Sequence, residues 1–345
     1  MVRKVLYILL ALGPLVVVLD HAGVGDITLF VVAAAALIPL AWLIGEATEH
    51  AAHHTGPGIG GFLNATFGNA PELIIALIAV NDGLTEVVRG SLTGSVVGNL
   101  LLVLGFSLAF GGRGRLDRES SLTSFALVAF AVLLFLIPSV PGWTGDPNRH
   151  ALAILSVPVS ILLLVVYVAV TWFSLRRHRQ QHTSDEPGSM AAWSLTRSIL
   201  VLGGATVITA FVAEILVGSL ETFAEKAHLS DFFVAAVIVA IVGNAAEHGG
   251  AVVVAHRGKI TLAAEIALAS SAQVAVFLIP AVVLLSWLIE PLALSFRPVE
   301  IAALAASTAF ASVLLWGGYS SRARGVALIG AYLVVAVAFL IAGDR

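Results

Sequence analysis

The chain has 345 residues, of which 59% are hydrophobic and 11% charged, and its formal net charge is −3. Soluble globular proteins carry roughly 25% charged residues, so this composition excludes that class and favours a polytopic membrane protein. The negative balance argues against nucleic acid as a partner. The absence of cysteine excludes disulfides and thiolate-bound metals.

Long apolar segments follow one another along most of the chain. A transmembrane helix needs about 20 such residues to cross the hydrocarbon core. Eleven segments qualify: 5–20, 26–50, 60–81, 91–110, 121–140, 150–175, 194–221, 230–255, 260–289, 298–317 and 324–342. We therefore expect an all-α polytopic membrane protein with about 11 transmembrane helices. The first segment lacks a signal-peptide cleavage site, so we take it as a transmembrane helix.

The Lys and Arg residues of the short loops predict the orientation. With a cytoplasmic N-terminus, 13 of the 18 basic residues fall on the cytoplasmic side. This bias is typical of cytoplasmic loops, so we expect a cytoplasmic N-terminus and an outer C-terminus. Asp82 and Glu86 are then expected to be solvated at the outer mouth.

The sequence contains an internal repeat at a separation of 175 residues. Residues 67–83 align with 242–258, with six of 17 positions identical, including a Gly-Asn-Ala-x-Glu run at Gly68–Glu72 and Gly243–Glu247. The runs lie in the third and eighth segments, which cross the membrane in opposite directions. Such inverted repeats are common in secondary transporters, whose site lies between the repeats near the midplane. We expect an N-terminal helix at 1–24, two inverted five-helix repeats at 25–175 and 194–345, and a cytoplasmic linker at 176–193.

Each run places an asparagine and a glutamate three residues apart, on one face of a helix. These pairs are Asn69 with Glu72 and Asn244 with Glu247. A carboxylate inside a membrane is costly and therefore marks a functional site. Hard cations such as Ca²⁺ bind about six to eight oxygen ligands from carboxylates, amides and hydroxyls. We predict that both pairs bind one cation, and that Pro71 leaves a backbone carbonyl free in the first run.

The helix after each run carries further oxygen-bearing side chains. Ser95 and Asn99 follow the first run, and Ser270 and Gln273 follow the second. These four side chains complete an oxygen cage in our interpretation. The alternative is that they only hydrogen-bond neighbouring helices, as polar side chains in membranes often do.

Other titratable residues have less definite assignments. His248 lies beside Glu247 and is a candidate for proton transfer near neutral pH. Three acidic residues, Glu49, Glu221 and Glu265, are candidates for an access route or for structural pairing.

A remote alternative is an intramembrane metal-dependent hydrolase. It would use His50, His53 and His54, of which the first and third have the spacing of a zinc pair, or His248. The three clustered histidines lie at a helix end beside a Thr-Gly-Pro sequence, where a solvated position is expected. No set of converging zinc ligands is evident in the sequence.

The two runs and their following helices resemble the calcium/cation–proton exchanger (CAX) family of the cation/calcium exchanger superfamily. The resemblance covers nearly the whole chain and rests on Gly68–Leu77, Gly94–Asn99, Gly243–His248 and Ser270–Gln273. It implies a secondary active antiporter, not an enzyme, that exports cytosolic Ca²⁺ in exchange for protons by alternating access. Glu72 and Glu247 would then be the shared Ca²⁺ and proton site, without any cofactor.

The resemblance also has implications for location and partners. The linker holds only Asp185 and Glu186 where family members often have an acidic stretch, which removes the basis for a calcium-collecting role. The short N-terminus favours a prokaryotic cytoplasmic membrane, with the lipid bilayer as surroundings and homo-oligomer formation left open. Exchange of another cation, coupling to Na⁺ and a passive channel are the transport alternatives.

Overall fold

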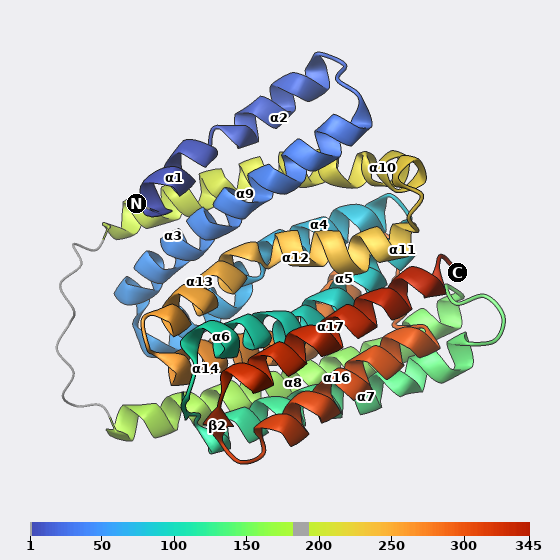
Figure 1. Ribbon diagram of the computed structural model, residues 1–345. Coiled ribbons are helices and arrows are strands. Elements are labelled where there is room, and N and C mark those ends of the chain that lie inside the picture. The colour runs from blue at the N-terminus through green and yellow to red at the C-terminus, as the bar shows by residue number, and fades with distance from the viewer. Residues whose placement is uncertain (1, 182–192) are drawn as a thin grey trace.

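The computed structural model describes residues 2–181 and 193–345, which are almost entirely helical (Figure 1). Long apolar runs form helices because lipid offers no hydrogen bonds to the backbone. The α-helices are α1 (Val2–Leu9), α2 (Leu12–His21), α3 (Asp26–Gly68), α4 (Ala70–Asn81), α5 (Thr85–Val97), α6 (Leu104–Gly111), α7 (Arg118–Gly142), α8 (His150–Gln181), α9 (Leu195–Gly218), α10 (Leu220–Ala227), α11 (Asp231–Phe233), α12 (Ala240–Gly243), α13 (Ala245–His256), α14 (Ile260–Gln273), α15 (Ile279–Ser286), α16 (Pro298–Leu315) and α17 (Arg322–Ala342).

Short π-helical and extended segments complete the secondary structure. The π-helical segments are η1 (Gly98–Val103), η2 (Val234–Val239) and η3 (Val274–Leu278). Two short strands, β1 (Gly114–Arg115) and β2 (Tyr319–Ser320), pair antiparallel, with Gly114 opposite Ser320.

Within the described residues, nine helices are long and apolar enough to cross a membrane. They correspond to nine of the 11 predicted segments. The other two, 60–81 and 230–255, are the segments with the repeated run, and each is interrupted at its asparagine. Counting the bent pair Leu220–Ala227 and Asp231–Gly243, which meet at 111°, gives ten spans. The all-α polytopic fold is therefore as expected, but the two interrupted segments lower the number of full-length spans.

The helix α3 changes direction between the predicted second and third segments. A Cβ atom on Gly60 would lie 2.9 Å from the carbonyl oxygen of Ala52, eight residues earlier. A straight helix would separate these positions by about 12 Å, at roughly 1.5 Å per residue. The chain therefore turns back here, and its returning part continues into α4 (Figure 1).

Large apolar side chains cover much of the outer surface. Leu288, Ile341 and Val313 are 83%, 79% and 75% exposed. Exposed apolar side chains of this size and number are unfavourable in water and are accommodated by lipid tails. The molecule therefore has the surface of an integral membrane protein.

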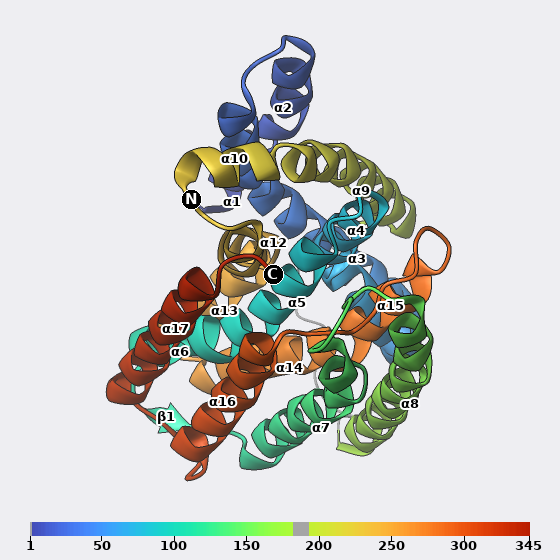
Figure 2. The same ribbon diagram turned by 90° about the vertical axis from the view of Figure 1, so that its right-hand side faces the viewer.

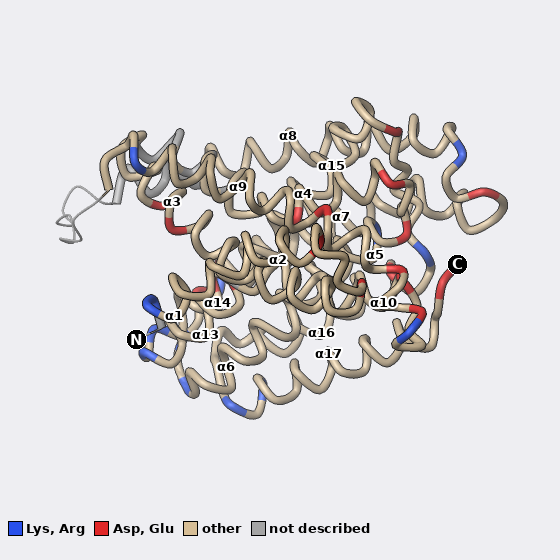
Figure 3. The backbone as a smooth tube through the Cα atoms, turned by 90° about the horizontal axis from the view of Figure 1, so that it is seen from above, with Lys and Arg blue, Asp and Glu red and all other residues tan. Residues whose placement is uncertain are grey.

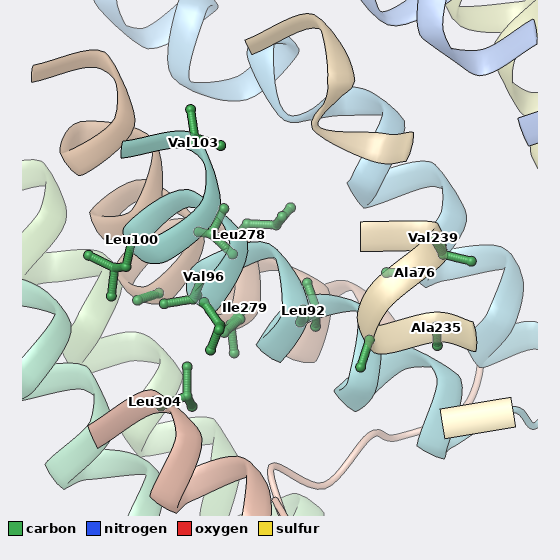
Figure 4. Packing of buried hydrophobic residues seen from close by; sticks show 14 of the residues in the cluster. Ala76, Leu92, Val96, Leu100, Val103, Ala235, Val239, Leu278, Ile279 and Leu304 are labelled. Carbon is green, nitrogen blue, oxygen red and sulfur yellow. The ribbon is translucent and has the colours of Figure 1, made fainter. Parts of the chain in front are cut away.

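The helix α5 lies at the centre of the bundle (Figure 2). In an 18-residue stretch of the span Thr85–Gly111, which α5 begins, 83% of the residues are buried, whereas the corresponding value for the span Arg3–His21 is 11%. Figure 4 shows Leu92 and Val96 of α5 among apolar side chains of η2 and α15, including Val239 and Ile279. The centre of the apolar core is thus the helix that carries the predicted ligand Ser95 and leads directly into η1, which carries Asn99.

The predicted linker 176–193 lies mostly outside the described residues. Its first six residues, 176–181, continue α8. The predicted N-terminal helix is divided into α1, which packs on α3, and α2, which packs on α3 and α9. The N- and C-termini lie at opposite ends of the molecule (Figure 1).

Gly94 should be essential for the packing of α5 against η2. A Cβ atom at this position would lie 1.9 Å from the carbonyl oxygen of Ala236, whereas a Cβ at Gly98 meets nothing within 4 Å. Gly94→Ala is therefore expected to destabilise the protein by at least about 1–3 kcal/mol, because a backbone contact would have to open. Thermal unfolding in detergent measures this effect, with Gly98→Ala as the matched control. Equal stability of the two variants would contradict the close approach of α5 and η2.

Candidate functional site

Both repeated runs interrupt their helices at the asparagine. Asn69 has φ −100° and ψ 17°, and Asn244 has φ −89° and ψ 4°, so neither continues an α-helix. The following helices begin one residue later, at Ala70 and Ala245. The prediction that each Asn–Glu pair shares one face of a continuous helix is therefore wrong: the asparagine ends one helix, and the glutamate belongs to the next.

This interruption gives both glutamates a favourable electrostatic position. Glu72 and Glu247 lie in the first turns of α4 and α13. The N-terminal end of a helix carries partial positive charge and unpaired N–H groups, which stabilise an anionic side chain nearby. Each carboxylate thus lies at the N-terminal end of its helix, which is the end that stabilises a negative charge.

The break does not depend on proline. Pro71 was expected to leave the carbonyl of Phe67 free, but that carbonyl accepts a hydrogen bond from the Asn69 N–H. The second run has Ala246 at the position of Pro71 and breaks at the same place. The shared Gly-Asn pair is the feature common to both breaks.

The two runs pack against each other through their glycines. A Cβ atom on Gly68 would lie 3.8 Å from Oε1 of Glu247. Reciprocally, a Cβ atom on Gly243 would lie 3.2 Å from Cγ of Glu72. Each glycine thus leaves room for the glutamate of the other run. The two carboxylates are close enough to repel each other electrostatically.

Amide and hydroxyl groups from both halves of the chain form a hydrogen-bond network beside the glutamates. Asn244 Nδ2 donates to Ser95 Oγ at 2.8 Å. Asn99 Nδ2 donates to Ser270 Oγ at 2.9 Å and to Asn244 Oδ1 at 3.4 Å. Ser270 Oγ in turn donates to Glu247 Oε2. The structure therefore joins four of the predicted side chains to one of the two carboxylates.

Glu72 differs from Glu247 in its hydrogen bonding. Its side chain is only 7% exposed, and its Oε2 atom has no hydrogen-bond partner in the described part of the chain. A small cavity adjoins it, lined by Glu72, Ile75, Ser91, Leu92, Ser95, Val239 and Ala240. Two close carboxylates with amide and hydroxyl oxygens around them form a site suited to a hard divalent cation.

The remaining predicted site residues lie in varied positions. Asn69 is buried at the end of α3. Gln273 makes a side-chain hydrogen bond with Tyr167 of α8. The Nε2 atom of His248 is buried and lacks a hydrogen-bond partner among the residues described. These positions place the Asn69 amide and the His248 imidazole next to the two broken helices.

The acidic residues assigned to an access route differ in exposure. Glu49 in α3 and Glu221 in α10 are both exposed, and Glu265 is partly buried in α14. No hydrogen bond within the described ranges joins either of the two exposed glutamates to the network. Their role as an access route stays a prediction.

The histidines considered for a zinc centre have other contacts. His50 lies 3.6 Å from Glu46 and stacks on Trp193, with ring centroids 4.6 Å apart. A ring nitrogen of His54 lies 2.7 Å from the carbonyl oxygen of Trp193. Among the described residues, no group of three or more His, Asp or Glu side chains is placed to hold a metal. The geometry therefore gives no support to a hydrolytic zinc centre.

Sequence reasoning missed a buried carboxylate, Glu300, in the first turn of α16. It is fully buried, and its two oxygens accept hydrogen bonds from Thr93 Oγ1 at 3.1 Å and from the Arg297 N–H at 2.7 Å. Arg89, only 1% exposed, donates to Asn148 Oδ1 at 3.0 Å. A polar residue near a segment boundary is expected from sequence to be solvated, so only its tertiary neighbours reveal that it is buried.

Glu86 belongs to the same charged region. It lies 3.3 Å from Arg89, 3.6 Å from Arg297 and 4.0 Å from Arg345. The expectation that Glu86 is simply solvated at the outer mouth is therefore wrong. The three arginines offset its charge and connect α5 to the loop before α16 and to the residues after α17.

Comparison with known proteins gives matches over nearly the whole chain. The family model "Sodium/calcium exchanger protein" matches residues 26–176 and 197–341. The chain is 37% identical over 355 residues to the Ca²⁺/H⁺ antiporter ChaA of Bacillus subtilis, covering 98% of this chain and 99% of that protein. It is 34% identical over 365 residues to a Ca²⁺/H⁺ antiporter of Synechocystis, covering 97% of each. The solved structure of native YfkE superimposes with a TM-score of 0.84 at 35% identity, covering 97% of this chain and 99% of that one, which confirms the fold class.

The hydrogen bond between Ser95 and Asn244 should be energetically coupled. Ser95→Ala and Asn244→Ala each leave a buried polar group of the other residue without its partner. Their double variant is expected to be more stable than additivity predicts, by about 0.5–1.5 kcal/mol. Thermal unfolding of the four proteins measures this coupling. Ser139→Ala combined with Asn244→Ala is the control, because Ser139 donates its hydrogen bond to the Leu294 carbonyl and not to Asn244. Additive changes in stability in both double-mutant cycles would contradict the network.

Proposed function

Because the chain belongs to the Ca²⁺/H⁺ antiporter (CAX) family within the sodium/calcium exchanger superfamily, we propose that it exchanges Ca²⁺ for protons across a membrane. The family consists of transporters rather than enzymes. The predicted resemblance to this family is thereby confirmed. The observation that carries the functional proposal is the packing of the two runs, which brings Glu72 and Glu247 together.

The proposed binding site holds Ca²⁺ as the transported substrate. The two carboxylates neutralise the divalent charge, and uncharged oxygens complete the coordination without adding charge. Glu72, Glu247, Asn69, Asn244, Ser95, Asn99 and Ser270 are the proposed oxygen ligands. Figure 3 shows Lys and Arg toward the two ends of the molecule, and acidic positions both there and near α4, the helix that carries Glu72.

The mechanism follows from the cost of charge in an apolar interior. Two bare carboxylates side by side are unfavourable, so either a Ca²⁺ ion or protons must neutralise them. Only the neutralised states then pass readily between the inward-open and outward-open conformations. Exchange is obligatory because the empty, doubly charged carrier is the state that crosses least. Two inverted repeats, at 25–175 and 194–345, would give the two open states similar local geometry.

We place the N-terminus in the cytoplasm and the C-terminus outside. The two termini lie at opposite ends of the molecule (Figure 1), as they would if all 11 predicted segments, nine full-length and two interrupted, cross the membrane. The assignment puts 13 of the 18 Lys and Arg residues on the cytoplasmic side. The bacterial relatives favour a cytoplasmic membrane, across which this transporter would export cytosolic Ca²⁺.

Neutralising either glutamate should abolish transport. Glu72→Gln and Glu247→Gln keep the shape of the side chain but remove the charge that binds Ca²⁺ and the group that carries a proton. We expect uptake of radioactive Ca²⁺ driven by a pH gradient to fall to background in inverted vesicles and in proteoliposomes. A pH gradient and a Na⁺ gradient are imposed in parallel, so the coupling ion is measured directly.

The matched control is Glu225→Gln, the same chemical change at an exposed position in α10. It should transport at the wild-type rate. Near-normal Ca²⁺ uptake by either buried-glutamate variant would overturn the shared site. Uptake driven by Na⁺ and not by protons would replace the proposed coupling, and flux without any coupling would indicate a channel.

The two glycines of the runs should differ in their tolerance of a methyl group. Gly243→Ala would place its Cβ 3.2 Å from Cγ of Glu72, a tighter contact than the 3.8 Å between a Cβ at Gly68 and Glu247. We expect Gly243→Ala to lower Ca²⁺ transport about tenfold, because displacing a binding group by a fraction of an ångström is costly. Gly68→Ala, the matched variant, should lose much less. Equal activity of the two variants would contradict this asymmetry between the two glycine contacts.

A further inference from the structure

The two glutamates have unequal surroundings although their sequences repeat. Glu247 accepts a hydrogen bond from Ser270, the residue that aligns with Ser95 in the repeat. Glu72 receives no such bond at Oε2, which is buried and unpartnered within the described residues. The hydroxyl oxygen of Ser95 instead accepts a hydrogen bond from Asn244. The side chain of Glu72 therefore has an oxygen available for another group in the adjoining cavity.

That cavity contains a hydroxyl group outside the predicted site. Besides Glu72, its polar lining consists of Ser95 and Ser91, and the other lining residues are apolar. Ser91 is 8% exposed, and its hydroxyl donates to the Val88 carbonyl at 3.1 Å. Because this bond uses the proton, the lone pairs of the Ser91 oxygen stay available to a cation.

The position of Ser91 is peculiar to the first half of the chain. Ser91 and Ser95 lie one helical turn apart on α5, so both face the same side of the helix. The repeat aligns Ser95 with Ser270 but aligns Ser91 with Ile266. The second half thus has no hydroxyl at the matching position, and the additional oxygen serves Glu72 alone.

We propose that Ser91 is a further Ca²⁺ ligand, placed between Glu72 and the end of α5 that begins at Thr85. This inference rests on the proposed function. The apolar walls of the cavity offer no oxygen to a partly dehydrated cation, so the hydroxyls and Glu72 must provide them. In the orientation proposed above, this end of α5 faces outward, and Ca²⁺ released from Glu72 passes Ser91 on its way out.

Removing the hydroxyl tests the ligand role. Ser91→Ala should raise the apparent Km for Ca²⁺ about fivefold, the effect of losing one modest polar interaction, with kcat unchanged. Ser91→Thr keeps the hydroxyl and should restore the Km. Ser107→Ala is the matched control, because Ser107 is a buried serine of α6 that does not line the cavity beside Glu72. A wild-type Km in Ser91→Ala would overturn the proposal.

Cysteine labelling tests the position in the ion path. The chain has no cysteine, so Ser91→Cys introduces a single thiol. A small cationic thiol reagent added from the outer side should modify it, and Ca²⁺ should slow the reaction. Ser107→Cys should stay unmodified. An inert thiol in an active Ser91→Cys variant, or modification that Ca²⁺ does not slow, would overturn the path.

Different results would overturn the proposed function and the role of Ser91. If Glu72→Gln still transports Ca²⁺, the proposed function fails whatever Ser91 shows. If Glu72→Gln is inactive while Ser91→Ala has the wild-type Km, only the role of Ser91 is overturned. Monodispersity in detergent is measured for every variant and identifies a protein that has not folded. Ser91→Ala and Ser91→Thr provide the Km test even if Ser91→Cys does not fold.

Discussion

Two neighbouring carboxylates in an apolar interior are the constraint on which the rest of this structure depends. Glu72 and Glu247 repel each other, and lipid-like surroundings do not offset their charge. The chain responds by ending a helix just before each glutamate, which places it at a partly positive helix end. Glycines at the crossing make room for the carboxylates, and amide groups from both halves fill the space beside them. The cation or protons that neutralise this pair would supply what the protein itself leaves uncompensated.

The central helix α5 fixes the geometry of that pair. Its backbone approaches η2 so closely that Gly94 has no room for a side chain. Polar side chains of α5 and of η1, the π-helical segment that follows it, reach the second half of the chain. Ser95 of α5 accepts a hydrogen bond from Asn244. Asn99 of η1 donates a hydrogen bond to Ser270. The end of α5 that begins at Thr85 is held by the charged region around Arg89 and Glu300. One buried helix therefore connects the site, the apolar core and this charged region.

Repetition of sequence did not produce repetition of environment. The two glutamates align in the repeat, yet one accepts a serine hydroxyl and the other lies beside a cavity. The asymmetry arises from neighbours that differ between the halves, such as Ser91 against Ile266. An exchanger that carries two different ions has no need of identical half-sites. This difference gives the inferred ion path a direction.

The sequence by itself determined the membrane class, nine of the spans and the pair of glutamates, because apolar length and misplaced charge are local properties. It did not show that both asparagines end a helix, since a Gly-Asn pair within an apolar run also fits a continuous helix. It also missed Glu300 and misjudged Glu86, because partners more than 200 residues away decide their burial and pairing. The hydrogen-bond network and the cavity at Ser91 are likewise products of packing. Only the tertiary structure decided them, because hydrogen bonds and cavities depend on which distant side chains meet.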